Sequence, residues 1–478
     1  MDTPDQLCGA SDLSTDNVDA ALALEQVKGV PTPDNAPHRD GSASWAVLKT
    51  FAFRVMMLVV NFGTGVTVAR TLAPLGRGEQ TALALWPLLL PSLATLGLPL
   101  AIIYNSRRRP DDAGRFYFVG VITMIVTGCF VALVGAIAMP YILRGYDPLL
   151  VRYAQWFMLF APQVLTQLVI RAHFEANGEF TRSILTQLVP TFLTLVALLI
   201  LRFLNLLSPV TAALCYLAPP CLVTFSLLIQ TWPRMVPGFV SFREDVAILL
   251  TYGLRSYGAD LINALSGQID VAIIVAFLNP VALGLYSVAI SISHLLYIVQ
   301  TSIVTVLFPH ASGLEADAAI SLIGRTARLS LLVSIVFAGV LIAVAPPVLP
   351  LVYGQDFQSA VMLIPLLTIE AVLTGICWVL GTAFQTTGRP VVVTLMQTGW
   401  FACALVLLVV LVPRMQTIGA AVALMLASLF RFILMVVCYR IVLHRNLPQL
   451  FPNASDVAYI YGKMKILASR RRSLSVEV

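Results

Sequence analysis

Charged residues are scarce in this sequence. Only 11% of the 478 residues are Asp, Glu, Lys or Arg, whereas 58% are hydrophobic, and the mean hydropathy is +0.87. A soluble fold needs roughly a quarter of its residues charged. This shortage excludes a soluble protein and predicts a polytopic membrane protein whose surface faces lipid.

The sequence also lacks the alternation of apolar and polar residues that transmembrane strands show over about ten residues. Its apolar runs are instead unbroken, as in FYFVGVITMIVTGCFVALVGAIAM at residues 116–139. A run of roughly twenty residues crosses about 30 Å of hydrocarbon as an α-helix. The predicted fold class is therefore an all-α integral membrane protein.

Cysteine is rare, and six of the seven cysteines lie inside apolar runs. They do not have the spacing of metal ligands, so we interpret them as small buried hydrophobic residues and expect no metal site. The sequence contains no nucleotide-binding motif, and we expect no cofactor. The net charge of +6 comes from the loops and needs no nucleic-acid partner to explain it.

The two ends of the chain differ from the rest. Residues 1–45 are rich in Asp, Ser and Pro and have too little apolar surface for a core. They lack the basic start and apolar centre of a secretory signal. We predict a disordered cytoplasmic tail there and a basic cytoplasmic tail over residues 443–478.

Between the tails, charges, Gly and Pro divide the apolar sequence into about twelve predicted transmembrane helices. Their approximate bounds are 46–70, 80–104, 115–140, 152–175, 182–204, 210–232, 246–276, 282–308, 325–350, 359–385, 391–413 and 418–442. No loop between them is long enough to hold a folded domain. The function is therefore expected to be carried out within the bilayer.

The basic residues in the short loops predict the orientation, because cytoplasmic loops carry an excess of Lys and Arg. Seventeen basic residues fall on the side that holds both termini, and six fall on the opposite side. The six are Arg70, Arg77, Arg144, Arg152, Arg202 and Arg414. Both termini are therefore predicted to be cytoplasmic.

Two pairs of short segments repeat along the chain. In RTLAPLGRGEQTALA (70–84) and AFLNPVALGLYSVAI (276–290), a Leu is followed two places on by Pro and four further by Gly. In HFEANGEF (173–180) and AFQTTGRP (383–390), a Phe is followed four places on by Gly. The offsets are 206 and 210 residues, and each pair takes the same place in a set of six helices.

These repeats predict an N-terminal six-helix bundle at 46–232 and a C-terminal one at 246–442, related by pseudo-symmetry. Internal repeats of this kind are characteristic of secondary transporters, which move one half against the other around a central site. Gly78 and Gly284 follow Pro74 and Pro280 in turns on the predicted periplasmic side. Those turns either let the halves reorient or simply connect two helices.

Ionisable residues inside the hydrocarbon are costly and normally face an interior cavity. On a helix, Arg54 and Asn61 share one face of the first span, and Arg255, Asn263 and Asp270 share one face of the seventh. A guanidinium group suits phosphate, because its planar fork donates two hydrogen bonds and stays charged. An arginine-lined cavity would favour an anion such as a diphosphate.

Further ionisable candidates are Glu370 in the tenth span, Arg431 in the twelfth and Asp260 in the seventh. The alternative is that these charges pair with one another for helix packing. As substrate-binding cavity residues we predict Arg54, Asn61, Arg255, Asn263 and Arg431. As candidates for coupling transport to a proton or sodium gradient we predict Asp270, Glu370 and Asp260.

At these residues the sequence resembles the Wzx-type oligosaccharide flippases of the MOP (multidrug/oligosaccharidyl-lipid/polysaccharide) exporter superfamily. The resemblance covers about residues 45–445. The matching segments are VARTLAPLGRGEQTALAL, TYGLRSYGADLINALSGQIDVAIIVAFLNPVALGLYSVA, VLFPHAS, LVYGQDF, AFQTTGRP and VPRMQTIGAAVALMLAS.

The resemblance implies two six-helix bundles forming a V around a central cavity, as in MATE-like transporters of this superfamily. It implies a flippase that moves a polyprenyl-diphosphate-linked oligosaccharide across the bacterial inner membrane by alternating access. Arg54 and Arg255 fall where such flippases place cationic cavity residues, and Asp270 matches a recurrent acidic position. A polysaccharide polymerase and export machinery are the protein partners that this role implies.

Two other functions stay open at this point. A multidrug exporter of the same fold would expel organic cations against protons or sodium, and it should carry lone acidic residues in its cavity. A polysaccharide polymerase or polyprenyl-phosphate-dependent glycosyltransferase would need catalytic groups on periplasmic loops, which are short here and hold few carboxylates. We therefore expect a transporter and not an enzyme.

Overall fold

The computed structural model describes residues 40–237 and 242–445, with the backbone alone for residues 40–51 and 54. The tail predicted over 1–45 lies almost wholly outside the described residues, as does most of the tail predicted over 443–478. The chain divides into two units, 1–50 and 51–478.

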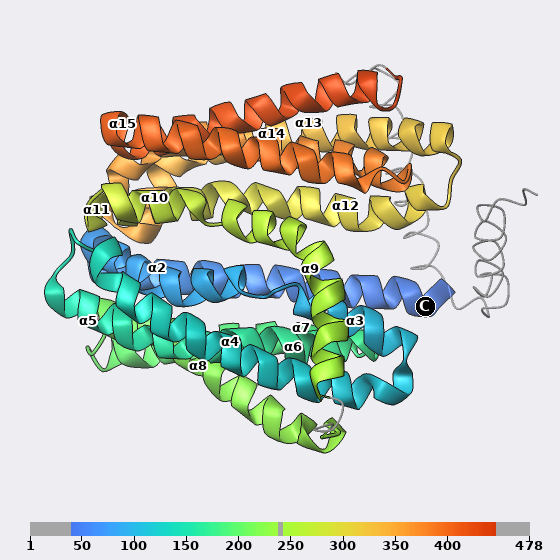
Figure 1. Ribbon diagram of the computed structural model, residues 1–478. Helices are drawn as coiled ribbons and strands as arrows, with labels where there is room; N and C mark the ends of the chain where they lie inside the picture. The colour runs from blue at the N-terminus through green and yellow to red at the C-terminus, as the bar shows by residue number, and fades with distance from the viewer. Residues whose placement is uncertain (1–39, 238–241, 446–478) are drawn as a thin grey trace, which may run out of the picture. The chain divides into compact units, whose positions relative to one another are not determined.

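The described residues fold into α-helices joined by short turns and 3-10 segments (Figure 1). The first part of the chain forms α2 (Asp40–Leu93), α3 (Leu98–Arg108), α4 (Ala113–Ile142), α5 (Pro148–Phe157), α6 (Ala161–Ala176), α7 (Phe180–Phe203) and α8 (Pro209–Thr231). The second part forms α9 (Phe242–Ser266), α10 (Ile269–Phe277), α11 (Pro280–Ser293), α12 (Tyr297–Ser312), α13 (Ala316–Tyr353), α14 (Ile364–Thr386) and α15 (Pro390–Ile441). The 3-10 segments are η2 (Pro110–Asp112), η3 (Met158–Phe160), η4 (Trp232–Arg234), η5 (His294–Leu296) and η6 (Gln355–Leu363).

Two of these helices are too long for a single membrane crossing. α2 has 54 residues and α15 has 52, which correspond to about 80 Å of continuous helix. Each contains one residue with a positive φ, Ala73 at 55° in α2 and Gln416 at 53° in α15. Each is therefore two spans joined by a one-residue turn, where the sequence predicted a loop.

The seventh predicted span, 246–276, is not one straight helix. α9 ends at Ser266, and α10 begins at Ile269 with its axis bent by 50°. Gln268 takes a φ of −142°, which interrupts the hydrogen-bond ladder next to Gly267. The second predicted span is also interrupted, because Leu96 and Gly97 both have positive φ values between α2 and α3.

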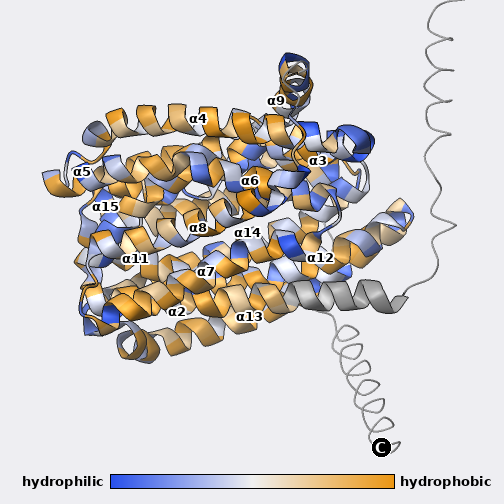
Figure 2. Ribbon diagram, turned by 90° about the horizontal axis from the view of Figure 1, so that it is seen from below, coloured by the Kyte–Doolittle hydropathy of each residue, from blue (hydrophilic) through white to orange (hydrophobic). Residues whose placement is uncertain are grey.

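Eight helices in the described residues are long and apolar enough to cross a membrane, or nine when α9 and α10 count as one span. Dividing α2 and α15 at their turns and joining the interrupted segments 74–108 and 148–176 gives twelve spans. The predicted all-helical transmembrane fold is thus confirmed. Figure 2 shows hydrophobic residues along the helices, and large apolar side chains such as Phe130 (66%) and Phe225 (63%) are exposed.

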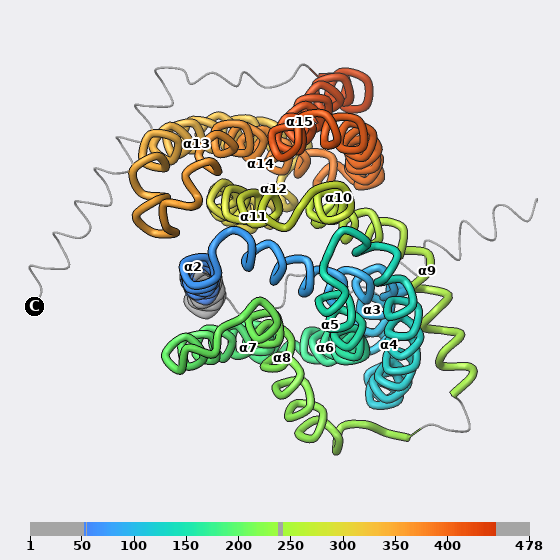
Figure 3. Tube along the Cα trace, turned by 90° about the vertical axis from the view of Figure 1, so that its left-hand side faces the viewer, coloured from blue at the N-terminus to red at the C-terminus, as the bar shows by residue number. Residues whose placement is uncertain are grey.

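The helices pack in two groups that follow the order of the chain (Figure 3). One hydrophobic cluster is built from α3, α4, α6 and the start of α9. Another is built from α12, α13, α14 and α15. The largest cluster joins residues from both halves. The exact bundle boundaries, 46–232 and 246–442, remain predictions, because α9 contacts α3 and α4 as well as α15.

The second repeated pair has the same backbone geometry in both halves. Gly178 and Gly388 each have a φ of 75°. The residue after each glycine donates its N–H to the carbonyl of the repeated Phe, Phe174 or Phe384, and both bonds are 2.8 Å long. This six-residue hydrogen bond is the helix ending that a glycine after the last turn provides. The repeat seen in the sequence is therefore also present in the structure.

Candidate functional site

The first repeated pair brings the two halves into direct contact. Pro74 begins the helix after the turn of α2, and Pro280 begins α11, so each glycine lies in the first turns of its helix. A Cβ on Gly78 would overlap the carbonyl of Pro280, and a Cβ on Gly284 would overlap the carbonyl of Pro74. Only glycine permits this reciprocal approach, so the turns are contact points between the halves and not only helix connections.

A second close contact joins α3 to α9. Gly97 and Gly253 approach so closely that a Cβ on either residue would overlap the backbone of the opposing segment. Beside them the rings of Tyr104 and Tyr252 stack with their centroids 4.2 Å apart. The first part of α9 therefore packs on the N-terminal half, although the sequence places it at the start of the C-terminal one.

Two adjoining cavities, of about 470 and 300 Å³, lie between the halves. Both are lined by Arg77, Tyr216 and Ser291. The larger cavity adds residues of α2, α10 and α11, including Gln80, Gln268 and Ser287. The smaller one adds Asn61, Thr64 and Tyr353, among others.

Arg77 is the one charged residue that lines these two cavities in the described part of the chain. Its Nη1 donates a 2.8 Å hydrogen bond to Oε1 of Gln80, and its Nε is buried with no hydrogen-bond partner in the described residues. The guanidinium thus has unused donors at the boundary between the halves. The sequence predicts a loop at Arg77, but Pro74 starts a helix that places Arg77 against the cavities.

A third cavity, of about 330 Å³, lies within the C-terminal part of the chain. It brings together four of the predicted site residues, Asn263, Asp270, Glu370 and Arg431. The other polar or aromatic residues that line it are Ser266, His294, Tyr297, Thr374, Trp378, Gln397 and Trp400. Residues that are distant in the sequence therefore meet in one place, from α9, α10, α14 and α15.

The carboxylate of Glu370 is almost fully buried, with 3% of the residue exposed. It accepts hydrogen bonds from Oγ1 of Thr374 at 2.7 Å, from Oγ of Ser428 at 3.1 Å and from the hydroxyl of Tyr297 at 3.1 Å. Three hydroxyl donors offset much of the cost of placing a carboxylate in a low-dielectric interior.

Asp270 is similarly buried, and its Oδ2 accepts a 2.6 Å hydrogen bond from the hydroxyl of Tyr286. Arg431 lines the same cavity, but in the described residues it forms no ion pair and its Nε has no hydrogen-bond partner. The cavity therefore holds two carboxylates and a separate guanidinium. Across the described ranges, no three His, Cys, Asp or Glu side chains gather as they would around a metal ion.

The remaining predicted residues fall in different places. Asn61 lines the smaller cavity between the halves. Arg255 and Asp260 are exposed and line none of the cavities described above. The side chain of Arg54 lies outside the described residues. The substrate-binding and ion-coupling roles assigned to all eight residues stay predictions.

Several solved membrane transporters have a similar fold. A multidrug-resistance MATE family transporter of the MOP superfamily, in an inward-facing conformation, has a TM-score of 0.63 at 16% identity over 87% of this chain and 96% of that chain. The lipid II flippase MurJ, in an inward closed conformation, has a TM-score of 0.70 at 12% identity over 82% of this chain and 87% of that chain. A MOP superfamily transporter from Pyrococcus furiosus, described as having a binding pocket of reversed polarity, has a TM-score of 0.55 at 14% identity over 81% and 93%. At these identities the likeness shows a common fold.

No curated protein matches the chain in sequence. A family model described as "Polysaccharide biosynthesis protein" matches residues 67–362, which is more than half of the chain. The match includes the turn at Ala73, Arg77, Asp270 and both members of the first repeat. The chain therefore belongs to the family of polysaccharide biosynthesis proteins, and it has the transporter fold of the MOP superfamily.

Proposed function

We propose that the protein is a flippase that moves a polyprenyl-diphosphate-linked oligosaccharide across the bacterial inner membrane by alternating access. The family match supports a role in making a surface or secreted polysaccharide, and the fold supports transport. In this proposal both termini are cytoplasmic, and the product passes to a polymerase and export machinery. The chain acts as a carrier and not as an enzyme.

The observation that carries this proposal is the position of Arg77. It lines both cavities between the halves, where a moving cargo must pass, and it has unused hydrogen-bond donors. A guanidinium in a poorly hydrated site binds phosphate oxygens through charge-assisted hydrogen bonds. The diphosphate would lie at Arg77, while neutral groups such as Asn61, Gln80 and Ser291 would face the sugar hydroxyls.

The contact at Gly78 and Gly284 supports the alternating-access part of the proposal. It holds the two halves together at the end of the spans that the loop charges predict to be periplasmic. Release of the cargo on that side requires these backbones to separate. In this mechanism the repeated motif is the contact that closes before loading and opens for release.

The cavity in the C-terminal half supports coupling to an ion gradient. Asp270 and Glu370 are buried carboxylates that accept hydrogen bonds from neutral groups, including the hydroxyls of Tyr286 and Thr374, so each can exchange a proton or bind a sodium ion. Occupation of that site changes the charge inside the C-terminal half, which would bias the packing of α10, α14 and α15. A proton or sodium gradient would then drive the return of the empty carrier.

The second candidate is a multidrug exporter. It is favoured by the same two buried carboxylates, because an organic cation could bind them, and by the likeness to a MATE family transporter. Against it stands Arg77, which would repel a cation at the boundary between the halves. A cation exporter would also need its carboxylates on the path of the cargo, whereas Asp270 and Glu370 line a cavity inside the C-terminal half.

Removal of the gene separates the two candidates. If the protein is a flippase, lipid-linked glycan accumulates on the cytoplasmic face, the surface polymer is lost and drug sensitivity is unchanged. Complementation with Arg77→Gln should restore much less surface polymer than complementation with Arg202→Gln, because Arg202 is an exposed arginine at the end of α7. Raised drug sensitivity with normal polymer would overturn the proposal in favour of the exporter.

A further inference from the structure

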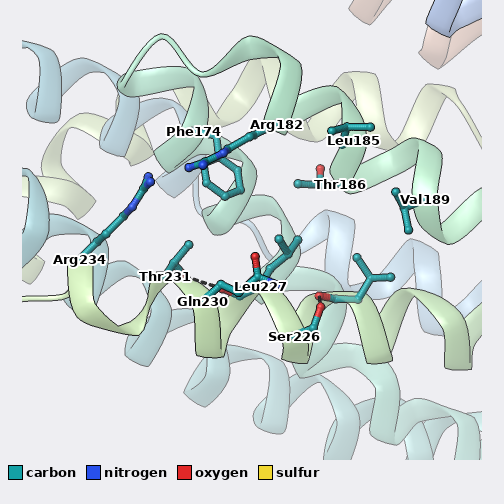
Figure 4. Close-up of a pocket in the computed structure, with 11 residues that line it drawn as sticks. Phe174, Arg182, Leu185, Thr186, Val189, Ser226, Leu227, Gln230, Thr231 and Arg234 are labelled. Atoms are coloured by element: carbon teal, nitrogen blue, oxygen red, sulfur yellow. Dashed lines mark hydrogen bonds between the residues drawn. The ribbon is translucent and has the colours of Figure 1, made fainter.

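A fourth cavity, of about 430 Å³, lies between α7 and α8, away from the sites described above (Figure 4). It is lined only by residues of α6, α7, α8 and η4, all from the N-terminal half. It shares no lining residue with the cavities between the halves or with the cavity in the C-terminal half. The proposed flippase mechanism therefore does not account for it.

One end of this groove is cationic. Arg182 from the start of α7 and Arg234 from η4 reach toward one another across the ring of Phe174 (Figure 4), and the guanidinium of Arg234 lies 6.0 Å from the centre of that ring. Both arginines bind the carboxylate of Glu179, at 2.6 and 2.8 Å. Two positive charges on one negative charge leave this end of the groove net positive.

Glu179 holds these two guanidinium groups in place but uses only part of their hydrogen-bond donors. Burial would raise the pKa of Glu179, but hydrogen bonds from Arg234 and Arg182 and their charges outweigh burial and lower the pKa below its ordinary value. The carboxylate therefore stays ionised at neutral pH and holds both arginines in place. Each arginine makes a single hydrogen bond in the described residues, so most of its N–H donors remain available to a ligand.

The rest of the groove has an apolar stripe beside four polar residues, which are Thr186, Ser226, Gln230 and Thr231. Leu185 and Val189 of α7 face Val223 and Leu227 of α8, and 36% of Leu185 and 40% of Val189 are exposed. Val189 is seven residues beyond Arg182, a distance of about 10 Å along the helix. The groove thus runs from a cationic end, where α7 begins and α8 ends, to a part inside the two spans where Leu185, Val189, Val223 and Leu227 form an apolar stripe.

We propose that this groove is a binding site for an anionic glycerophospholipid. The lipid phosphate would accept hydrogen bonds from Arg182 and Arg234, and one acyl chain would lie between α7 and α8 along Leu185 and Val189. The arginines lie at the ends of two candidate spans, the depth at which lipid headgroups meet water. A soluble phosphate would use the cationic end alone, and a zwitterionic lipid would bring its own cation to a net positive site.

The test uses the purified full-length protein in a neutral detergent, with its thermal unfolding followed as lipid is added. Phosphatidylglycerol should raise the melting temperature by about 3–6 °C, because a ligand that binds only the folded state stabilises it. Phosphatidylcholine and inorganic phosphate at equal concentration should raise it by less than about 1 °C. Equal stabilisation by phosphatidylcholine, or by phosphate alone, would overturn the proposal.

Substitutions in the groove test whether phosphatidylglycerol raises the melting temperature by binding there. Arg182→Gln with Arg234→Gln should abolish the shift that phosphatidylglycerol causes, whereas Arg202→Gln, at the other end of α7, should retain it. Because the double variant also leaves Glu179 without its partners, a second variant keeps the ion pairs and fills the apolar part. Val189→Trp should abolish the shift as well, and a shift of normal size in Val189→Trp would contradict the proposed path of the acyl chain.

Discussion

The cavities between the two halves and the cavity inside the C-terminal half carry opposite chemistry. Arg77 is the charged residue of the first pair, and it has no carboxylate partner in the described residues. Asp270 and Glu370 lie in the other cavity, held by neutral hydroxyls, with Arg431 nearby but not paired with them. The guanidinium of Arg77 thus lies where the halves meet, and the two carboxylates lie inside the C-terminal half.

This separation explains how one carrier could recognise an anionic cargo while exchanging cations. A carboxylate within reach of Arg77 would form an ion pair with it, and that pair would have to be broken before an anionic cargo could bind. Kept apart, the guanidinium and the carboxylates each retain free hydrogen-bonding capacity. The predictions below test whether the two regions act separately, beginning with the contact on which both depend.

The largest effect is expected from Gly78→Val or Gly284→Val. Either side chain would overlap a proline carbonyl of the opposite half, so the halves could no longer close at that end. Export of lipid-linked glycan in complemented cells should fall by more than about 100-fold at normal protein level. Gly339→Val is the control, because a Cβ at Gly339 meets no atom within 4 Å. Normal export by Gly78→Val and by Gly284→Val would show that the contact is not needed for transport.

The next effect is expected from Arg77→Gln, which removes the charge from the cavities between the halves. Losing a charge-assisted hydrogen bond of about 1.5–3 kcal/mol should slow export by about 10- to 100-fold. Arg77→Lys should keep part of the activity, because it restores the charge without the planar fork. Radiolabelled glycan reaching the outer leaflet measures the rate, and equal rates for Arg77→Gln and the wild type would remove the anion site.

A smaller and different effect is expected from Asp270→Asn and Glu370→Gln. These variants keep the approximate shape of the C-terminal cavity but remove the negative charge of each carboxylate. In proteoliposomes, an imposed proton or sodium gradient should accelerate wild-type transport by about tenfold and leave the variants at the rate without a gradient. Stimulation of both variants by the same gradient would place the coupling site elsewhere.

The smallest expected effect is a loss of stability from substitution of Gly178 or Gly388, and it should be equal in the two halves. Gly178 and Gly388 share a φ of 75° and have open space around them, so Gly178→Ala and Gly388→Ala should each lower the free energy of unfolding by about 1 kcal/mol through backbone strain. Gly339→Ala, in a helix with open space, should not destabilise. Unequal losses in thermal unfolding of the two variants would mean that the two helix endings are not equivalent.

The sequence predicted the fold well because hydrocarbon imposes a simple rule on it. Every backbone group inside the bilayer must be satisfied within a helix, so span lengths and breaks follow from apolar runs. The turns at Ala73 and Gln416 were predicted as loops because Arg and Pro surround them. Each turn consists of one residue with a positive φ. The hydropathy of the sequence does not distinguish such a short turn from a longer loop.

The site was predicted less completely, because a charge on a helix does not show which neighbour its face will meet. Asp270, Glu370 and Arg431 converge in one cavity. Arg255 was grouped with Asp270 by assuming one straight helix, but the break beside Gly267 changes the relation between them. Arg77 was missed in a predicted loop, although Gln80 and Thr81 follow it at the three- and four-residue spacing of one helix face.

The most direct test of the central claim is transport by purified protein in proteoliposomes. The wild type should move a labelled polyprenyl-diphosphate oligosaccharide between leaflets and should not move an organic cation, and Arg77→Gln should move the glycolipid at no more than about one tenth of the wild-type rate. Transport of the cation by the wild type, or an unchanged rate of glycolipid movement in Arg77→Gln, would contradict an anion site between the halves.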